Sequence, residues 1–119
     1  MAAAARLVVT TCPPEEADRI AGALLERRLV ACATALPGGA SRYWWKGSLE
    51  RAAETVLLLK TRADLVPAVE AALRELHPYE VFELLSFPSD GGAADYLRWI
   101  AEVTASPAPA PPPRSRPEA

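Results

Sequence analysis

The apolar residues of this chain repeat with a strand period and a helix period in turn, and this alternation restricts the fold more than any single motif. Residues 7–11 form a β-branched apolar run that is typical of a buried strand. Pro13 and Pro14 then suit the first turn of a helix, and the apolar positions after them recur every three or four residues. The pattern as a whole predicts strand 7–11, helix 13–25, strand 30–45 interrupted at 37–39, strand 54–61, helix 64–77, strand 81–87 and helix 96–103. This β-α-β-β-α-β-α order is the split βαβ pattern of an α+β, ferredoxin-like sandwich with an extended hairpin and a C-terminal helix.

The length and the distribution of proline predict one domain followed by a tail. A chain of 119 residues is long enough for one hydrophobic core and short for two. Residues 105–119 hold six of the twelve prolines and no large apolar side chain, so they cannot offset the entropy of ordering the segment. We therefore expect a folded domain over 1–104 and a disordered, Pro-rich tail over 105–119, a kind of segment that can also serve as an SH3-type ligand.

Charge and hydropathy argue against several classes of partner. The formal net charge is −2 and the pI is about 5.4, without the excess of Lys and Arg that a nucleic-acid-binding face needs. No segment approaches the roughly 18 apolar residues of a membrane span, and residues 1–5 lack the charged region of a secretory signal. Cys12 and Cys32 are the only cysteines, and their spacing fits neither a disulfide framework nor a C-x-x-C site. We expect a cytoplasmic protein with reduced thiols that binds neither nucleic acid nor membrane.

Five short motifs occur in an order and spacing that resemble the CutA, or divalent-cation tolerance, family. They are Val30-Ala-Cys-Ala-Thr34 with Pro37-Gly38, Tyr43-x-Trp45-x-Gly47, Leu59-Lys60-Thr61, His77-Pro78-Tyr79-Glu80-x-x-Glu83 and Tyr96-Leu97-x-Trp99. The resemblance covers about residues 7–103 and departs from the family pattern at Phe82, where relatives usually carry proline. It implies a homotrimer of ferredoxin-like subunits, a role in tolerance of copper and other divalent metals, and no enzymatic reaction.

One imidazole and two thiols are the candidate metal ligands. His77, the single histidine, is the first candidate because imidazole is a common ligand of copper and zinc; its expected place at a helix C-terminus is an equally good structural explanation. Cys32 can pack as a small hydrophobe or bind Cu(I) as a thiolate, and Cys12 is an accessory candidate before the first helix. With at most three scattered ligands of this kind, we expect low affinity for divalent metal ions, copper (Cu²⁺) being favoured, and no metal requirement for folding.

Aromatic and charged side chains indicate either a subunit interface or a ligand cleft. The expected hairpin carries an aromatic cluster, and such residues usually anchor subunit interfaces but can also stack a small ligand. The candidates are Tyr43, Trp45, Lys60, Tyr79, Glu80 and Glu83. The exposed edge of a long hairpin also invites pairing between chains, which a closed homotrimer would satisfy.

Three functional interpretations compete, none of them enzymatic. The chain lacks the G-x-S-x-G, P-loop, G-x-G-x-x-G and H-E-x-x-H motifs of common catalytic classes. The first interpretation is a trimeric divalent-metal (copper) tolerance or response protein. The second is a small-molecule sensor similar to the PII signalling proteins, which share this fold and hold anionic metabolites between subunits. The third is a trimeric scaffold without a ligand.

Overall fold

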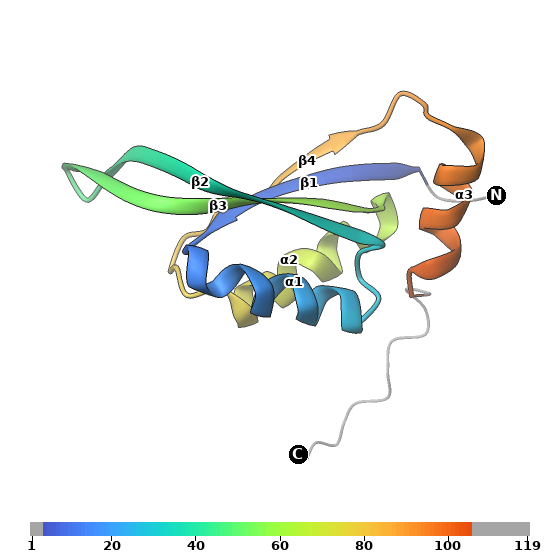
Figure 1. Ribbon diagram of the computed structural model, residues 1–119, viewed down its shortest axis with the longest axis horizontal. Helices are drawn as coiled ribbons and strands as arrows, with labels where there is room; N and C mark the ends of the chain where they lie inside the picture. The colour runs from blue at the N-terminus through green and yellow to red at the C-terminus, as the bar shows by residue number, and fades with distance from the viewer. Residues whose placement is uncertain (1–3, 106–119) are drawn as a thin grey trace, which may run out of the picture.

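Four antiparallel strands pair in the order β2-β3-β1-β4 within residues 4–105, the part of the chain that the computed structural model describes. The strands are β1 (Ala5–Cys12), β2 (Cys32–Trp45), β3 (Ser48–Arg62) and β4 (Leu85–Pro88), and the helices are α1 (Ala17–Glu26), α2 (Val66–Leu76) and α3 (Ala94–Val103). α1 and α2 lie on one side of the sheet, and α3 lies at one end (Figure 1). The predicted α+β, ferredoxin-like arrangement with a C-terminal helix is confirmed; the predicted tail lies, after Ala105, outside the described residues.

The hydrophobic core fills the space between the sheet and the helices α1 and α2. Both helices follow short 3₁₀ segments, and Pro67 occupies the first turn of α2, where the missing amide breaks no hydrogen bond. The fully buried side chains of this core include Val8, Leu57, Leu59, Ile20, Leu24, Val69 and Leu73. The helix stripes predict Ile20, Leu24, Val69 and Leu73, and the strand residues lie within the predicted apolar runs; Leu25, which the α1 stripe also includes, is 40% exposed instead. Among residues 4–105, no helix is long and apolar enough to cross a membrane.

The opposite face of the sheet is also apolar. The strand register aligns Val9 of β1 with Leu58 of β3 and Leu85 of β4. Side chains alternate along a strand, so these residues point away from the face that α1 and α2 cover. Leu36, Leu85 and Phe87 on this face are 47%, 54% and 46% exposed. The sheet therefore presents a second apolar layer that neither of these helices covers.

The β2–β3 hairpin is longer than the sequence predicts and projects beyond the helices (Figure 1). Lys46 and Gly47 form its predicted turn with φ values of +50° and +84°, the sign that a two-residue type I′ turn requires at both positions. β3 begins at Ser48, six residues before the predicted strand 54–61, because residues 48–53 pair with residues 40–45 across the hairpin.

The last strand is shorter than the predicted strand 81–87. β4 begins at Leu85, and residues 81–84 run as a connecting segment. Phe82 and Leu84 of this segment pack against the hydrophobic core instead of alternating in a ladder, which explains why the strand starts late. α3 begins at Ala94, two residues before the predicted helix.

Candidate functional site

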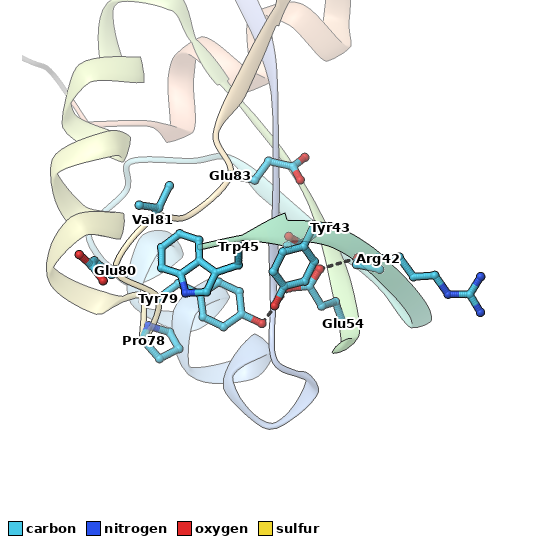
Figure 2. A pocket seen from close by; sticks show the side chains of 11 residues that line it. Arg42, Tyr43, Trp45, Glu54, Pro78, Tyr79, Glu80, Val81 and Glu83 are labelled. Carbon is cyan, nitrogen blue, oxygen red and sulfur yellow. Dashed lines mark hydrogen bonds between the residues drawn. The ribbon is translucent and has the colours of Figure 1, made fainter. Parts of the chain in front are cut away.

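A cleft of about 540 Å³ opens between the β2–β3 hairpin and the segment that follows α2. The aromatic rings of Tyr43, Trp45 and Tyr79 gather around it (Figure 2). The residues that line it are Thr11, Ser41, Arg42, Tyr43, Trp45, Glu54, Pro78, Tyr79, Glu80, Val81 and Glu83. A volume of this size lies within the range of small-molecule binding sites.

Glu54 is the one buried residue among those that line the cleft, with an exposed fraction of 5%. The Ser41 hydroxyl donates to Glu54 Oε1 at 2.6 Å, and the Tyr79 hydroxyl donates to Glu54 Oε2 at 2.7 Å. Within residues 4–105, no lysine or arginine forms a salt bridge with this carboxylate. Buried carboxylates are usually paired with a cation. Glu54 thus has hydrogen-bond donors and lacks a countercharge.

A β-bulge in β2 brings Ser41 close to Glu54. The pairing register shifts between Leu36 and Gly39, where Gly38 has a φ of +88° and Gly39 pairs with Glu54. A Cβ atom at Gly39 would lie 2.6 Å from the carbonyl oxygen of Glu54, which is too close for any ordinary contact. Glycine at this position therefore permits the close approach of the two strands that builds the cleft.

The Tyr79 hydroxyl is held in its protonated form. Burial, followed by the hydrogen bond to Glu54 and the negative charge of that carboxylate, raises the pKa of Tyr79 well above its ordinary value of 10.0. Loss of the proton would leave two negative charges at hydrogen-bond distance. Tyr79 therefore acts as a fixed donor to Glu54.

His77 lies at the C-terminal cap of α2, and its exposed fraction is 8%. Its Nε2 atom lies 2.7 Å from the Thr11 carbonyl oxygen, and the Tyr79 backbone N–H donates to its Nδ1 atom at 3.1 Å. A carbonyl can only accept and an amide N–H can only donate, so the ring is neutral with its proton on Nε2. In this conformation neither ring nitrogen has a free lone pair for a metal ion.

Two aromatic rings enclose the imidazole. The Phe82 ring stacks on His77 with a centroid distance of 5.3 Å and an interplanar angle of 18°, and the Tyr79 ring lies at 4.8 Å. The guanidinium of Arg74, a residue of α2, lies 4.8 Å from the centroid of the Phe82 ring. Phe82, the residue that departs from the family pattern, therefore packs between His77 and the helix.

The two cysteines occupy different environments. Cys12 is fully buried in the core, and burial, followed by the charge of Glu54, raises the pKa of its thiol above 9.0. Cys32 is half-buried, and the Lys60 ammonium lies 3.7 Å from its sulfur atom. Cys12 is thus a packing residue, whereas Cys32 is partly accessible on β2.

The predicted metal ligands His77, Cys12 and Cys32 do not form one group: the His77 ring contacts the carbonyl oxygen of Thr11, the residue before Cys12, whereas Cys32 lies elsewhere on the sheet. Cys12 pairs with Thr55 of β3, whereas Cys32 pairs with Lys60, five residues further along the same strand, or about 17 Å. Among the described residues, no group of three His, Cys, Asp or Glu side chains is close enough to hold a metal ion. Metal binding through these residues stays a prediction.

The predicted cleft residues fall into two groups. Those that line the cleft are Tyr43, Trp45, Tyr79, Glu80 and Glu83. Lys60 lies outside it, because it is six residues, or about 20 Å, along β3 from Glu54, and its ammonium donates to Thr34 Oγ1 at 2.7 Å. Sequence reasoning missed Glu54 and Ser41. A lone acidic residue at the start of an apolar strand run was the signal that could have identified Glu54.

Comparisons with known proteins agree with this fold. The family model described as CutA1 divalent ion tolerance protein matches residues 6–103. Protein CutA of Mus musculus is 43% identical over 97 residues, which are 81% of this chain and 55% of the mouse protein. The divalent-cation tolerance protein CutA of Pectobacterium atrosepticum is 42% identical over 95 residues, which are 79% of this chain and 86% of that protein. The crystal structure of CutA1 from Oryza sativa has a TM-score of 0.84 at 34% identity, and the match covers 87% of this chain and 96% of the rice chain.

These matches cover most of the described domain. The chain spans about half the length of the mouse and human CutA proteins that it matches. The family-model match over residues 6–103 nonetheless includes every strand and helix from β1 to α3, apart from Ala5 at the start of β1. The chain belongs to the CutA1 family of divalent ion tolerance proteins.

Proposed function

We propose that this protein is a trimeric divalent-metal tolerance or response protein that binds copper modestly and catalyses no reaction. The family and the relative from P. atrosepticum are named for tolerance of divalent ions and not for a reaction. The observation that carries the proposal of a trimer is the uncovered apolar face of the sheet. The hydrogen bonds of His77 account for the modest metal affinity.

The uncovered sheet face supports assembly. Leu36, Leu85 and Phe87 are about half exposed on that face, and Val9 and Leu58 lie between them in the register. Monomeric soluble proteins rarely leave a contiguous apolar patch of this kind in water. Three copies related by a closed rotation can bury the face and cover the sheet edges at the same time.

The hairpin supports the same conclusion. Trp44 and Leu49 are cross-strand partners near its end, and they are 72% and 66% exposed. The hairpin extends past the helices (Figure 1), and both side chains are mostly exposed in the described part of the chain. In a trimer, a neighbouring subunit can cover these two side chains.

Light scattering on the full chain tests the assembly. The expected mass is three times 12.7 kDa. Phe87→Glu adds a charge to the uncovered face and should split the trimer, whereas Leu25→Glu, on the solvent side of α1 at a residue that is 40% exposed, should not. A wild-type monomer at micromolar concentration would contradict the proposal.

The environment of His77 limits the affinity for a metal. Ligation through Nδ1 requires the loss of the 3.1 Å hydrogen bond from Tyr79, and ligation through Nε2 requires the loss of the 2.7 Å bond to Thr11. A buried hydrogen-bonding group that loses its partner is destabilised by about 1–3 kcal/mol, which subtracts from the binding free energy. Copper remains the favoured divalent ion, since Cu²⁺ binds most nitrogen and oxygen sites more tightly than Zn²⁺ or Ni²⁺.

Titration with Cu²⁺ tests the metal part of the proposal. We expect His77→Ala to weaken binding more than Cys32→Ser, and we expect the affinity to fall with falling pH because protons compete for the imidazole. Equal affinity of the wild type and His77→Ala across about pH 5–8 would show that other groups bind the metal.

A small-molecule sensor is the second candidate function, and the cleft favours it over a scaffold without a ligand. The cleft has the volume of a small-molecule site and contains a buried carboxylate that forms no salt bridge within residues 4–105. Three carboxylates and one guanidinium line it, so an anionic metabolite of the PII type would meet a net negative charge. A thermal-shift screen with nucleotides and metal ions separates the candidates, because a ligand of the folded state raises the melting temperature with its concentration.

The proposal includes a cytoplasmic location. The expectation rests on the two cysteines, which fit no disulfide framework and would be reduced in that compartment. Fractionation of cells that produce the protein tests this location directly.

A further inference from the structure

We propose that the cleft binds an organic ammonium ion, with Glu54 at its buried end and the aromatic rings of the hairpin along its wall. This ligand class differs from the divalent metals that the family tolerates, and the proposal does not depend on metal binding. It rests on the hydrogen-bond chemistry, the charge and the aromatic lining of the cleft.

The polar groups around Glu54 offer hydrogen-bond acceptors. The hydroxyls of Ser41 and Tyr79 each use their single proton on the Glu54 carboxylate, so they have only lone pairs left for a ligand. The carboxylate has about four acceptor positions and uses two of them. Glu80 and Glu83 add two further carboxylates to the lining. A ligand that brings several N–H donors matches this set.

The charge of the lining selects a cation. Three carboxylates line the cleft against a single guanidinium, that of Arg42. In Figure 2 the Arg42 side chain extends away from the rings of Tyr43 and Trp45, and the carboxylates of Glu80 and Glu83 also lie apart from Glu54, so Glu54 is the charge beside the rings. Because Glu54 is buried, its field is screened less than that of a surface carboxylate. An anion would be repelled and a cation attracted.

The aromatic rings accommodate a cation with an apolar body. In the single chain, Tyr43 and Trp45 are 40% and 36% exposed, so part of each ring is open to a ligand that enters the cleft. A cation near the face of such a ring is attracted by the ring quadrupole. The Lys46 ammonium already lies 5.4 Å from the centroid of the Trp45 ring. The rings would also remove the apolar part of a ligand from water.

A single metal ion fits the cleft less well than an organic cation. The cleft of about 540 Å³ is far larger than an ion with its ligands, and the described residues contain no cluster of three metal-ligating side chains. An organic cation can donate hydrogen bonds from its ammonium group to the acceptors and pack its aromatic or alkyl part against the aromatic rings.

Three probes of similar shape and different charge test this proposal on the full-length protein. Isothermal titration compares phenethylammonium, uncharged 2-phenylethanol and anionic phenylacetate. We expect phenethylammonium to bind and 2-phenylethanol to bind at least about tenfold more weakly, because hydrogen bonds between charged partners are about twice as strong as neutral ones. Phenylacetate should bind more weakly than either.

Matched variants assign the binding to the cleft. Glu54→Gln preserves the side-chain shape and should weaken phenethylammonium binding at least about tenfold, and Trp45→Leu should also weaken it. Glu70→Gln, which breaks the surface ion pair with Arg74 on α2, is the control and should bind like the wild type. Circular dichroism and light scattering verify that each variant is folded and assembled. If Glu54→Gln does not fold, Trp45→Leu and the comparison of the three probes still test whether the cleft binds the ammonium ion.

Several results would overturn the proposal. They are equal affinity for the ammonium and the alcohol, preference for phenylacetate, absence of binding by all three probes, or unchanged binding in Trp45→Leu. Titration of the same samples with Cu²⁺ keeps the ammonium proposal separate from the metal proposal, since each can fail while the other holds.

Discussion

Replacing Tyr79 with phenylalanine removes the hydroxyl that donates to Glu54 at 2.7 Å and leaves the aromatic ring in place. The acceptor is a carboxylate that is 5% exposed, so the bond belongs to the class that contributes about 1.5–3 kcal/mol. The lower part of that range applies because Tyr79 is half-buried and water in the cleft can replace its hydroxyl in part. We expect Tyr79→Phe to lower the free energy of unfolding by about 1.5–2 kcal/mol, a factor of about 10–30 in the folding equilibrium.

Urea denaturation at fixed protein concentration measures this loss. With a denaturant slope of about 2 kcal/mol per M, the midpoint should fall by about 0.7–1 M. The concentration must be fixed because assembly makes the apparent stability depend on it. Tyr96→Phe is the control: Tyr96 is 42% exposed on α3, and its hydroxyl forms no hydrogen bond within the described residues. Its effect should stay within about 0.5 kcal/mol.

A double-mutant cycle with Glu54→Gln tests whether the charge of the acceptor matters. In the Glu54→Gln background the bond joins neutral groups, so Tyr79→Phe should lower the stability by about 1 kcal/mol or less. The reasoning is refuted if Tyr79→Phe has the same effect in both backgrounds, or if its effect in the wild type is below about 0.5 kcal/mol.

Two further predictions concern pH and the β-bulge. Folding raises the pKa values of Cys12 and Tyr79 above 9.0 and 10.0, so the unfolded chain releases these protons at lower pH than the folded chain does. The free energy of unfolding should therefore fall as the pH rises above about 9. Urea denaturation between about pH 8 and pH 10.5 measures this, and a stability that does not change over that range would contradict it. Gly39→Ala places a Cβ atom 2.6 Å from the Glu54 carbonyl oxygen and should lower the free energy of unfolding by about 1–3 kcal/mol. The control Gly22→Ala, in α1 with no atom within 4 Å, should raise it by about 0.5–1 kcal/mol. Thermal denaturation compares the two variants, and equal effects would contradict the bulge geometry.

The fold could be predicted from the sequence because each element carries its own period. The buried stripes of α1 and α2 follow from the spacing of apolar residues, and the turn at Lys46-Gly47 follows from its composition. The strand boundaries that differ from the prediction are those set by contacts with residues distant in the sequence. Residues 48–53 have weak strand propensity and become a strand through pairing with residues 40–45. Phe82 has high strand propensity and leaves the ladder because its ring packs on His77.

The site could be predicted only in part, since its hydrogen bonds join distant segments. The aromatic residues of the hairpin and the residues after His77 were visible as motifs and do line the cleft. Glu54 meets Ser41 across a bulge, and it meets Tyr79 from a segment 25 residues away. No local pattern predicts that register. The hydrogen-bond partner of His77 Nε2 is a backbone carbonyl 66 residues away. Every residue has a backbone carbonyl, so the sequence does not indicate which one His77 contacts.

Tyr79 links the two proposed ligand sites. Its backbone N–H holds His77 Nδ1, and its hydroxyl holds Glu54. A metal ion that takes Nδ1 must break the first bond, which loosens the residue that makes the second. An ammonium ion beside Glu54 instead favours the arrangement in which Tyr79 stays in place. For metal ligation through Nδ1, we therefore expect each ligand to weaken the binding of the other by the same factor, because such coupling is reciprocal; ligation through Nε2 breaks only the bond to Thr11 and should show no such coupling through Tyr79.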